Sequence, residues 1–141
     1  MKILVCTDGS EQSLKAVQKA ADIVADIKEA QVTVVHVEES ISHPYEIPSR
    51  EHSPEGHEQL EKEHKKVLAK AQKVFEEKNV KAETAVKQGH PASTILEMAS
   101  KENYDLIVMG SRGLGGIKKL LLGSVSNAVV QEAEVSVLIV K

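Results

Sequence analysis

Apolar residues recur along the chain with two alternating periodicities. Short, continuous β-branched and apolar runs are typical of parallel strands covered on both faces, and they predict strands over residues 2–7, 32–37, 81–87, 105–109 and 135–140. Between them, apolar residues recur every three or four positions, as on one face of a helix. These stretches predict helices over residues 10–28, 53–78, 92–101 and 124–132.

Five strands alternating with four helices predict an α/β fold. We expect a doubly wound, open, five-stranded parallel sheet of order 3-2-1-4-5 with helices on both faces. No repeat or internal boundary interrupts the series, so one domain over residues 1–141 is expected. Ligands of such sheets bind beyond the carboxyl ends of the strands, where the winding direction reverses. That point brings Asp8, in the turn after the first strand, toward Gly110 after the fourth.

Composition narrows the classes of function. A chain of 141 residues can bury a core without a metal, and its single cysteine, Cys6, excludes an internal disulfide. The net charge of −3, with two Tyr, one Phe and no Trp, argues against nucleic-acid binding. No apolar run approaches the roughly 18 residues of a membrane span, and no leader pattern is recognisable. We therefore expect a cytoplasmic protein with no membrane partner.

Residues 108–130, VMGSRGLGGIKKLLLGSVSNAVV, have the composition of a backbone cradle for phosphate. A P-loop is excluded by spacing, because counting from Gly110 puts Gly116 where lysine is required. Counting from Gly113 puts Lys118 where the second glycine is required. The dinucleotide fingerprint fails too, because Lys118 replaces its last glycine and the loop follows the fourth strand, not the first.

The spacing that remains is Gly110, two residues, Gly113, nine residues, and Gly123 followed by Ser124. Glycine at the first two positions lets the main chain approach a phosphate without a Cβ in the way. Gly123 and Ser124 present unpaired amides and a hydroxyl at the start of the last helix. This stretch therefore predicts a phosphate site of another kind.

With this spacing the chain resembles the universal stress protein family, in particular its ATP-binding branch. The resemblance covers the whole chain and rests on ILVCTDGSEQSLKAV at the start, VVHV, YDLIVMGSRG and LLLGSVSNAVV. It implies an adenine nucleotide alpha hydrolase-like, Rossmann-like fold. Two departures leave the glycine pattern intact: family members often carry proline at Cys6, and often Cys-Pro-Val at residues 135–137.

The resemblance implies an ATP site. Adenine and ribose would lie near Thr7, Asp8 and the backbone of Val37, with Asp8 accepting from ribose hydroxyls. Magnesium or manganese would be held mainly by phosphate oxygens, with no protein metal ligand. Ribose and phosphates would be surrounded by Met109, Gly110, Arg112, Gly113, Gly123, Ser124, Val125 and Ser126.

Several of these residues, taken singly, also have an interpretation that involves no ligand. Asp8 alone would as readily cap a turn, and only its place at the switch point favours ribose binding. Lys118 and Lys119 are expected to be solvated. Cys6 is expected to be a buried small hydrophobe, and His36 a satisfied core or crevice residue.

A histidine-rich metal site is a weak alternative. His52, His57 and His64 lie near Glu61, but only Glu61 and His64 have a helical spacing. A metal site there is therefore not the expected interpretation.

Catalysis is not expected. ATP hydrolysis needs a positioned water, a base or orienting group and charge neutralisation. Asp8 would be occupied by ribose, the glycine-rich stretch has no second carboxylate, and Arg112 is its only clear cation. We expect a regulatory, stress-response ATP-binding protein whose nucleotide orders residues 110–126 and changes a surface for an unknown protein partner.

Two alternatives remain, and each has a sequence signature. An adenylyl-transferring or slowly ATP-hydrolysing enzyme is the first, but adenylyl transfer should show His-x-Gly-His where the chain has Thr7-Asp8-Gly9-Ser10. A nucleotide-free interaction module is the second, and it would be expected to lose the glycines.

The last strand predicts an interface. Val135 to Val140 carries no charge, and an uncovered edge of this kind favours aggregation unless something pairs with it. Self-pairing about a two-fold axis predicts a homodimer, as the resemblance also implies. Residues 39–53, which follow the second strand, are a candidate lid over the adenine side.

Overall fold

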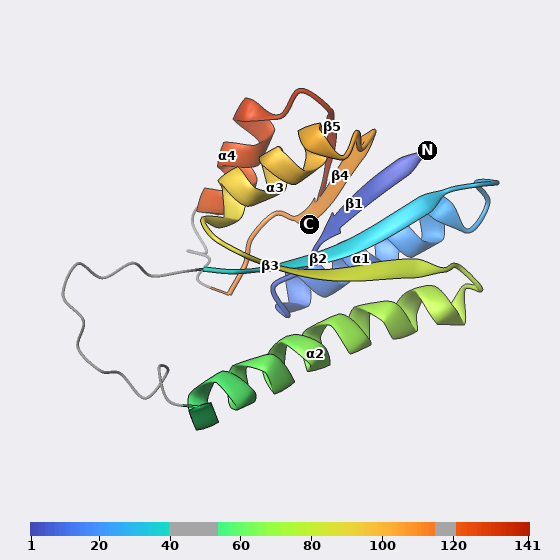
Figure 1. Ribbon diagram of the computed structural model, residues 1–141. Helices are drawn as coiled ribbons and strands as arrows, with labels where there is room; N and C mark the ends of the chain where they lie inside the picture. The colour runs from blue at the N-terminus through green and yellow to red at the C-terminus, as the bar shows by residue number, and fades with distance from the viewer. Residues whose placement is uncertain (40–53, 115–120) are drawn as a thin grey trace.

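The computed structural model describes residues 1–39, 54–114 and 121–141 (Figure 1). All the predicted strands and helices are present, in the predicted order along the chain. In chain order they are β1 (Lys2–Cys6), α1 (Glu11–Val24), β2 (Gln31–Glu38), α2 (Pro54–Glu77), β3 (Ala82–Gln88), α3 (Pro91–Lys101), β4 (Leu106–Gly110), α4 (Ser124–Glu132) and β5 (Ser136–Val140).

The strands form one parallel sheet of order β3-β2-β1-β4-β5, which confirms the prediction. In Figure 1, α1 and α2 cover one face of this sheet, and α3 and α4 cover the other. The winding direction reverses at β1, which pairs with β2 on one side and with β4 on the other. The carboxyl ends of β1 and β4 therefore lie next to each other.

The prediction for the first helix is wrong at its end. Helix α1 stops at Val24, four residues before Lys28. The N–H of Ile27 turns back to the carbonyl of Val24 at 3.0 Å, and Glu29 has a φ of 63°. This left-handed conformation is not compatible with a continuing helix.

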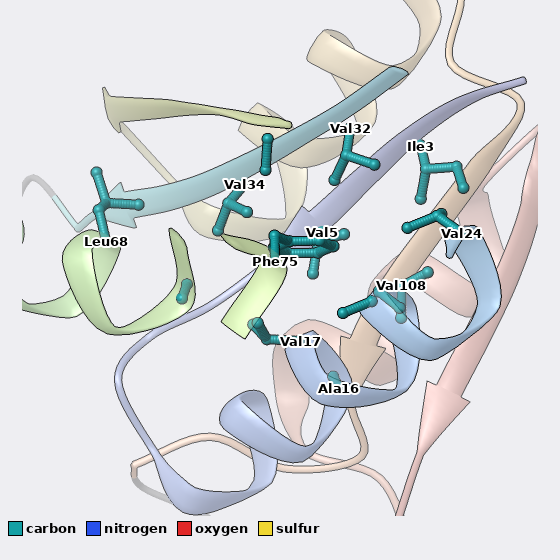
Figure 2. Packing of buried hydrophobic residues seen from close by; sticks show 14 residues of the cluster. Ile3, Val5, Ala16, Val17, Val24, Val32, Val34, Leu68, Phe75 and Val108 are labelled. Carbon is teal, nitrogen blue, oxygen red and sulfur yellow. The ribbon is translucent and has the colours of Figure 1, made fainter. Parts of the chain in front are cut away.

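Each face of the sheet carries its own apolar core. Ile3 and Val5 of β1 point toward α1 and α2, where Phe75 is fully buried (Figure 2). The intervening Leu4 and Cys6 point toward α3 and α4. Because both faces are covered, the central strands have no polar face, and this explains their continuous apolar runs.

The two edge strands are β3 and β5. The four apolar residues of β5, Val137 to Val140, are all half-buried. In β1 and β4, by contrast, every residue after the first is buried. In the parts of the chain that the structure describes, no helix is both long and apolar enough to cross a membrane.

Candidate functional site

A cavity of about 610 Å³ lies at the carboxyl end of the sheet, at the switch point. Its volume is in the range of small-molecule sites. Its walls come from the ends of β1, β2 and β4, from the start of α4, and from α2 and α3. The eleven residues predicted from the sequence all line it: Thr7, Asp8, Val37, Met109, Gly110, Arg112, Gly113, Gly123, Ser124, Val125 and Ser126.

Asp8 follows β1 and joins the turn before α1 to the glycine-rich loop. Its Oδ1 accepts a hydrogen bond from the Ser10 N–H at 3.0 Å, and its Oδ2 accepts one from the Leu114 N–H at 2.9 Å. Burial alone would raise the pKa of Asp8, but hydrogen bonds from Ser10, Ser13 and Leu114 outweigh it and lower the pKa. The carboxylate is therefore ionised at neutral pH, with one oxygen capping the turn and the other facing the loop.

Thr7 is held by polar contacts of its own. The residue is 7% exposed, and its hydroxyl lies 3.1 Å from the hydroxyl of Ser13. Its carbonyl accepts a hydrogen bond from Nδ1 of His36 at 2.9 Å. His36 is thus a satisfied crevice residue, as expected, and its ring packs against His64 of α2 with centroids 4.9 Å apart.

Val37 presents main-chain groups to the cavity. The carbonyl of Val35 accepts from the Thr7 N–H at 3.0 Å, so alternate residues of β2 direct their N–H and C=O toward β1. Strand β1 ends at Cys6, which is opposite Val35. The N–H and C=O of Val37 therefore lie on the β1 side of β2, beside Thr7 and at the wall of the cavity.

The three glycines of the motif meet different surroundings. A Cβ added at Gly110 would lie 2.9 Å from the carbonyl carbon and oxygen of Gln12 in α1, so this glycine allows helix and sheet to approach each other. A Cβ at Gly113 would lie 2.4 Å from Oδ2 of Asp8. At Gly123 the nearest atom would be 3.4 Å away, an ordinary contact. The lack of room for a Cβ therefore explains glycine at positions 110 and 113, but not at position 123.

Helix α4 begins at the cavity without a side-chain cap. Its N-cap is Gly123, and the N–H groups of Ser124, Val125 and Ser126 have no intrahelical partner because they form the first turn. The Ser126 hydroxyl is used inside the protein, where it donates to the Ser111 carbonyl at 2.8 Å. The first turn therefore offers main-chain donors and the positive end of a helix dipole.

Arg112 adds a positive charge beside this helix end. Its Nε is buried and has no hydrogen-bond partner within the described parts of the chain. A buried donor without a partner is costly, so an anion at this place would stabilise it. Lys118 and Lys119, which were expected to be solvated, lie outside the described residues.

Several lining residues were not predicted. They include Ser13, Leu114, Leu122 and His64. Ser10, Ser13 and Asp8 form one hydrogen-bonded turn, so the Ser-x-x-Ser spacing at the helix start was a usable signal. The sequence around His64 gave no such signal, because its place depends on how α2 packs against β2.

The histidine metal site gains no support. Over the three described segments, no group of three or more His, Cys, Asp or Glu side chains could hold a metal ion. His52 and the lid candidate from residue 40 onward lie outside the described residues, while Glu39 lines the cavity.

Comparison with known proteins identifies the family. The sequence model of a protein family, described as Universal stress protein family, matches residues 1–141. The chain belongs to this family. Among its relatives, Universal stress protein MJ0531 of Methanocaldococcus jannaschii is 38% identical over 140 residues, covering 99% of this chain and 81% of that protein. Universal stress protein YxiE of Bacillus subtilis is 36% identical over 146 residues, covering 99% and 98%.

Solved structures of universal stress proteins share the fold. UspA from Lactobacillus plantarum gives a TM-score of 0.84 at 26% identity, covering 100% of this chain and 97% of that one. A universal stress protein in complex with cAMP gives a TM-score of 0.72 at 27% identity, covering 100% and 96%. The family and the Rossmann-like fold that the motifs indicated are both confirmed.

Proposed function

We propose that this universal stress protein binds ATP in the cavity at the switch point and acts as a regulatory, stress-response protein. One observation carries the proposal: a single cavity joins an ionised carboxylate, an open main-chain edge and an uncapped helix start. Beside that helix start lies an arginine whose buried Nε has no hydrogen-bond partner among the described residues. The universal stress protein solved in complex with cAMP supports an adenine nucleotide as the ligand class.

The polar groups divide among the parts of the nucleotide. The N–H and C=O of Val37 match the acceptor and donor on the edge of adenine. Asp8 accepts from the ribose hydroxyls. Arg112 and the first-turn N–H groups of α4 hold the phosphates, because both favour negative charge. Magnesium or manganese is carried mainly by the phosphate oxygens, since Asp8 is the only carboxylate near them among the lining residues.

Regulation is a better proposal than turnover. Besides Asp8, the carboxylates that line the cavity are Glu38 and Glu39, at the end of β2 beside Val37. They lie on the adenine side, and both oxygens of Asp8 already accept hydrogen bonds. No carboxylate that lines the cavity is therefore left as a base beside the proposed phosphates, and slow hydrolysis is the second candidate. The nucleotide acts by changing the loop around Arg112 for a protein partner, and the protein works in the cytoplasm.

The edge strand β5 is the proposed homodimer interface. The Val140 carbonyl accepts from the Ser111 N–H at 2.8 Å, so alternate residues of β5 face β4. Val137 and Ile139 therefore direct their N–H and C=O groups to the open edge. Antiparallel pairing with a second copy would satisfy these groups and cover the half-buried side chains.

The nucleotide proposal is tested by calorimetry on nucleotide-free protein. ATP should bind saturably, and Arg112→Gln should weaken it about 10- to 150-fold, the value of a hydrogen bond to a charged group. Lys15→Gln removes the same charge from the exposed face of α1 and should leave affinity unchanged. Absence of ATP binding to the wild type would refute the proposal. Equal affinity of the Arg112 variant would refute the phosphate assignment.

A further inference from the structure

Two histidine rings form part of the wall of the cavity. His36 of β2 and His64 of α2 both line it, with ring centroids 4.9 Å apart and ring planes tilted by 51°. Both residues are half-buried. Among the described residues that line the cavity, no other side chain carries an aromatic ring. Aromatic rings are the groups on which proteins stack the bases of nucleotides, so this wall is the candidate for contact with a base.

The histidine pair lies on the side of the cavity that is proposed to hold adenine. His36 directly precedes Val37 at the end of β2, and α2 packs against β2 and β3. The groups proposed to hold the phosphates, Arg112 and the start of α4, come after β4, on the other side of β1. The two imidazoles are therefore near the proposed base and away from the proposed phosphates.

Both rings are held by contacts within the protein. Nδ1 of His36 lies 2.9 Å from the carbonyl oxygen of Thr7. Because a carbonyl can only accept, Nδ1 carries the hydrogen, and this bond joins β2 to the end of β1. His64 packs on the ring of His36. Helix α2 itself rests on the turn after β1, since a Cβ added at Gly9 would lie 2.9 Å from Cγ2 of Val67. The His64 ring is thus in position before a ligand binds.

The inward face of α2 changes character where it reaches the cavity. Leu68, Ala71 and Phe75 recur at helical spacing, are buried, and belong to the core beneath the sheet. His64 lies one turn before Leu68 on the same face of the helix, and there the neighbour is the cavity. An apolar side chain serves the core, whereas an imidazole can contact both a flat ring and water.

We propose that His64 recognises the base of the nucleotide by stacking its imidazole on adenine, and that His36 is the residue that positions it. This inference rests on the proposed nucleotide function. A purine offers a larger face to a stacked ring than a pyrimidine does, so the contact favours ATP over CTP. The triphosphate makes no contact with this wall, so its binding does not depend on His64.

Imidazole proton shifts of the full chain, labelled with ¹³C at histidine, test the contact directly. At saturation with ATP, the ring current of adenine should move the His64 signals upfield, and inorganic tripolyphosphate should leave them in place. His57, an exposed histidine two turns earlier on α2, is the internal reference and should not shift. Bound ATP that leaves the His64 signals unmoved, or equal shifts with tripolyphosphate, would overturn the inference and leave the nucleotide proposal standing. Failure of ATP to bind would overturn both.

The affinities of folded variants separate stacking from a structural role. His64→Ala should weaken ATP binding about fivefold or more, as expected for the loss of a base–aromatic stack, and should narrow the preference for ATP over CTP. His64→Phe keeps a flat ring and should restore ATP affinity. His57→Ala removes an imidazole from the exposed face of the same helix and should have no effect. Unchanged ATP affinity of His64→Ala, equal weakening of tripolyphosphate, or failure of phenylalanine to restore affinity would each contradict the stack.

Discussion

Replacing Gly110 with alanine separates packing from ligand binding in the glycine motif. The new Cβ would lie 2.9 Å from the carbonyl carbon and oxygen of Gln12 and 3.0 Å from the nitrogen of Ser13. These are main-chain atoms in the first turn of α1, so relief requires the helix to move away from β4. Overpacking of this kind costs about 1–3 kcal/mol. For a chain of this size that corresponds to a melting temperature lowered by about 3–12 °C.

Thermal unfolding followed by far-UV circular dichroism measures the effect, and Gly123→Ala is the matched control. Gly123 has a φ of −74° and a ψ of 170°, which any residue adopts, and its nearest neighbour would be 3.4 Å from the new Cβ. Alanine there should change stability by no more than about 1 kcal/mol, because its lower entropy in the unfolded chain is opposed by its poor N-cap preference. A melting temperature for Gly110→Ala equal to that of the wild type would refute the packing argument.

Three further predictions follow from other parts of the molecule. Val137→Pro removes an N–H from the open edge of β5 and should convert the proposed dimer to monomer in analytical ultracentrifugation. Leu138→Pro removes an N–H that faces β4 and should instead lower stability. A Val137→Pro protein that still dimerises like the wild type would exclude this interface. Burial raises the pKa of Cys6 to about 12, so the native thiol at pH 8 should react with iodoacetamide about a thousandfold more slowly than the unfolded chain, by mass spectrometry. ATP turnover by phosphate release should stay below about 1 s⁻¹, and faster release would contradict a regulatory role.

The fold could be predicted because its determinants are local. Continuous apolar runs, helical periodicity and the order of elements were enough to give the sheet and its switch point. The same reasoning brought Asp8 and Gly110 together, since parallel strands end at one edge. The end of α1 could not be predicted, because the apolar period continues to Ile27 while the chain turns back there.

The site was less predictable than the fold. Motif spacing indicated Gly110, Gly113, Gly123 and Ser124, and the family resemblance implied the other residues. All of them line the cavity, but neither argument could say what each residue does there. Gly110 was interpreted as making room for phosphate, and the structure shows that its missing Cβ makes room for α1. The hydroxyl of Ser126 bonds to Ser111, and His64 reaches the cavity from a distant helix. Such roles depend on tertiary contacts that no spacing encodes.

Titration of ATP into the ¹⁵N-labelled protein, followed by amide chemical shifts, tests whether ATP binds at the carboxyl end of the sheet. We predict saturable shifts concentrated on the amides that line the cavity, above all those of Val37, Ser124 and Val125. The amides around Tyr104, at the opposite end of the sheet, should stay unchanged. No shifts at millimolar ATP, or shifts concentrated away from the carboxyl end of the sheet, would contradict it.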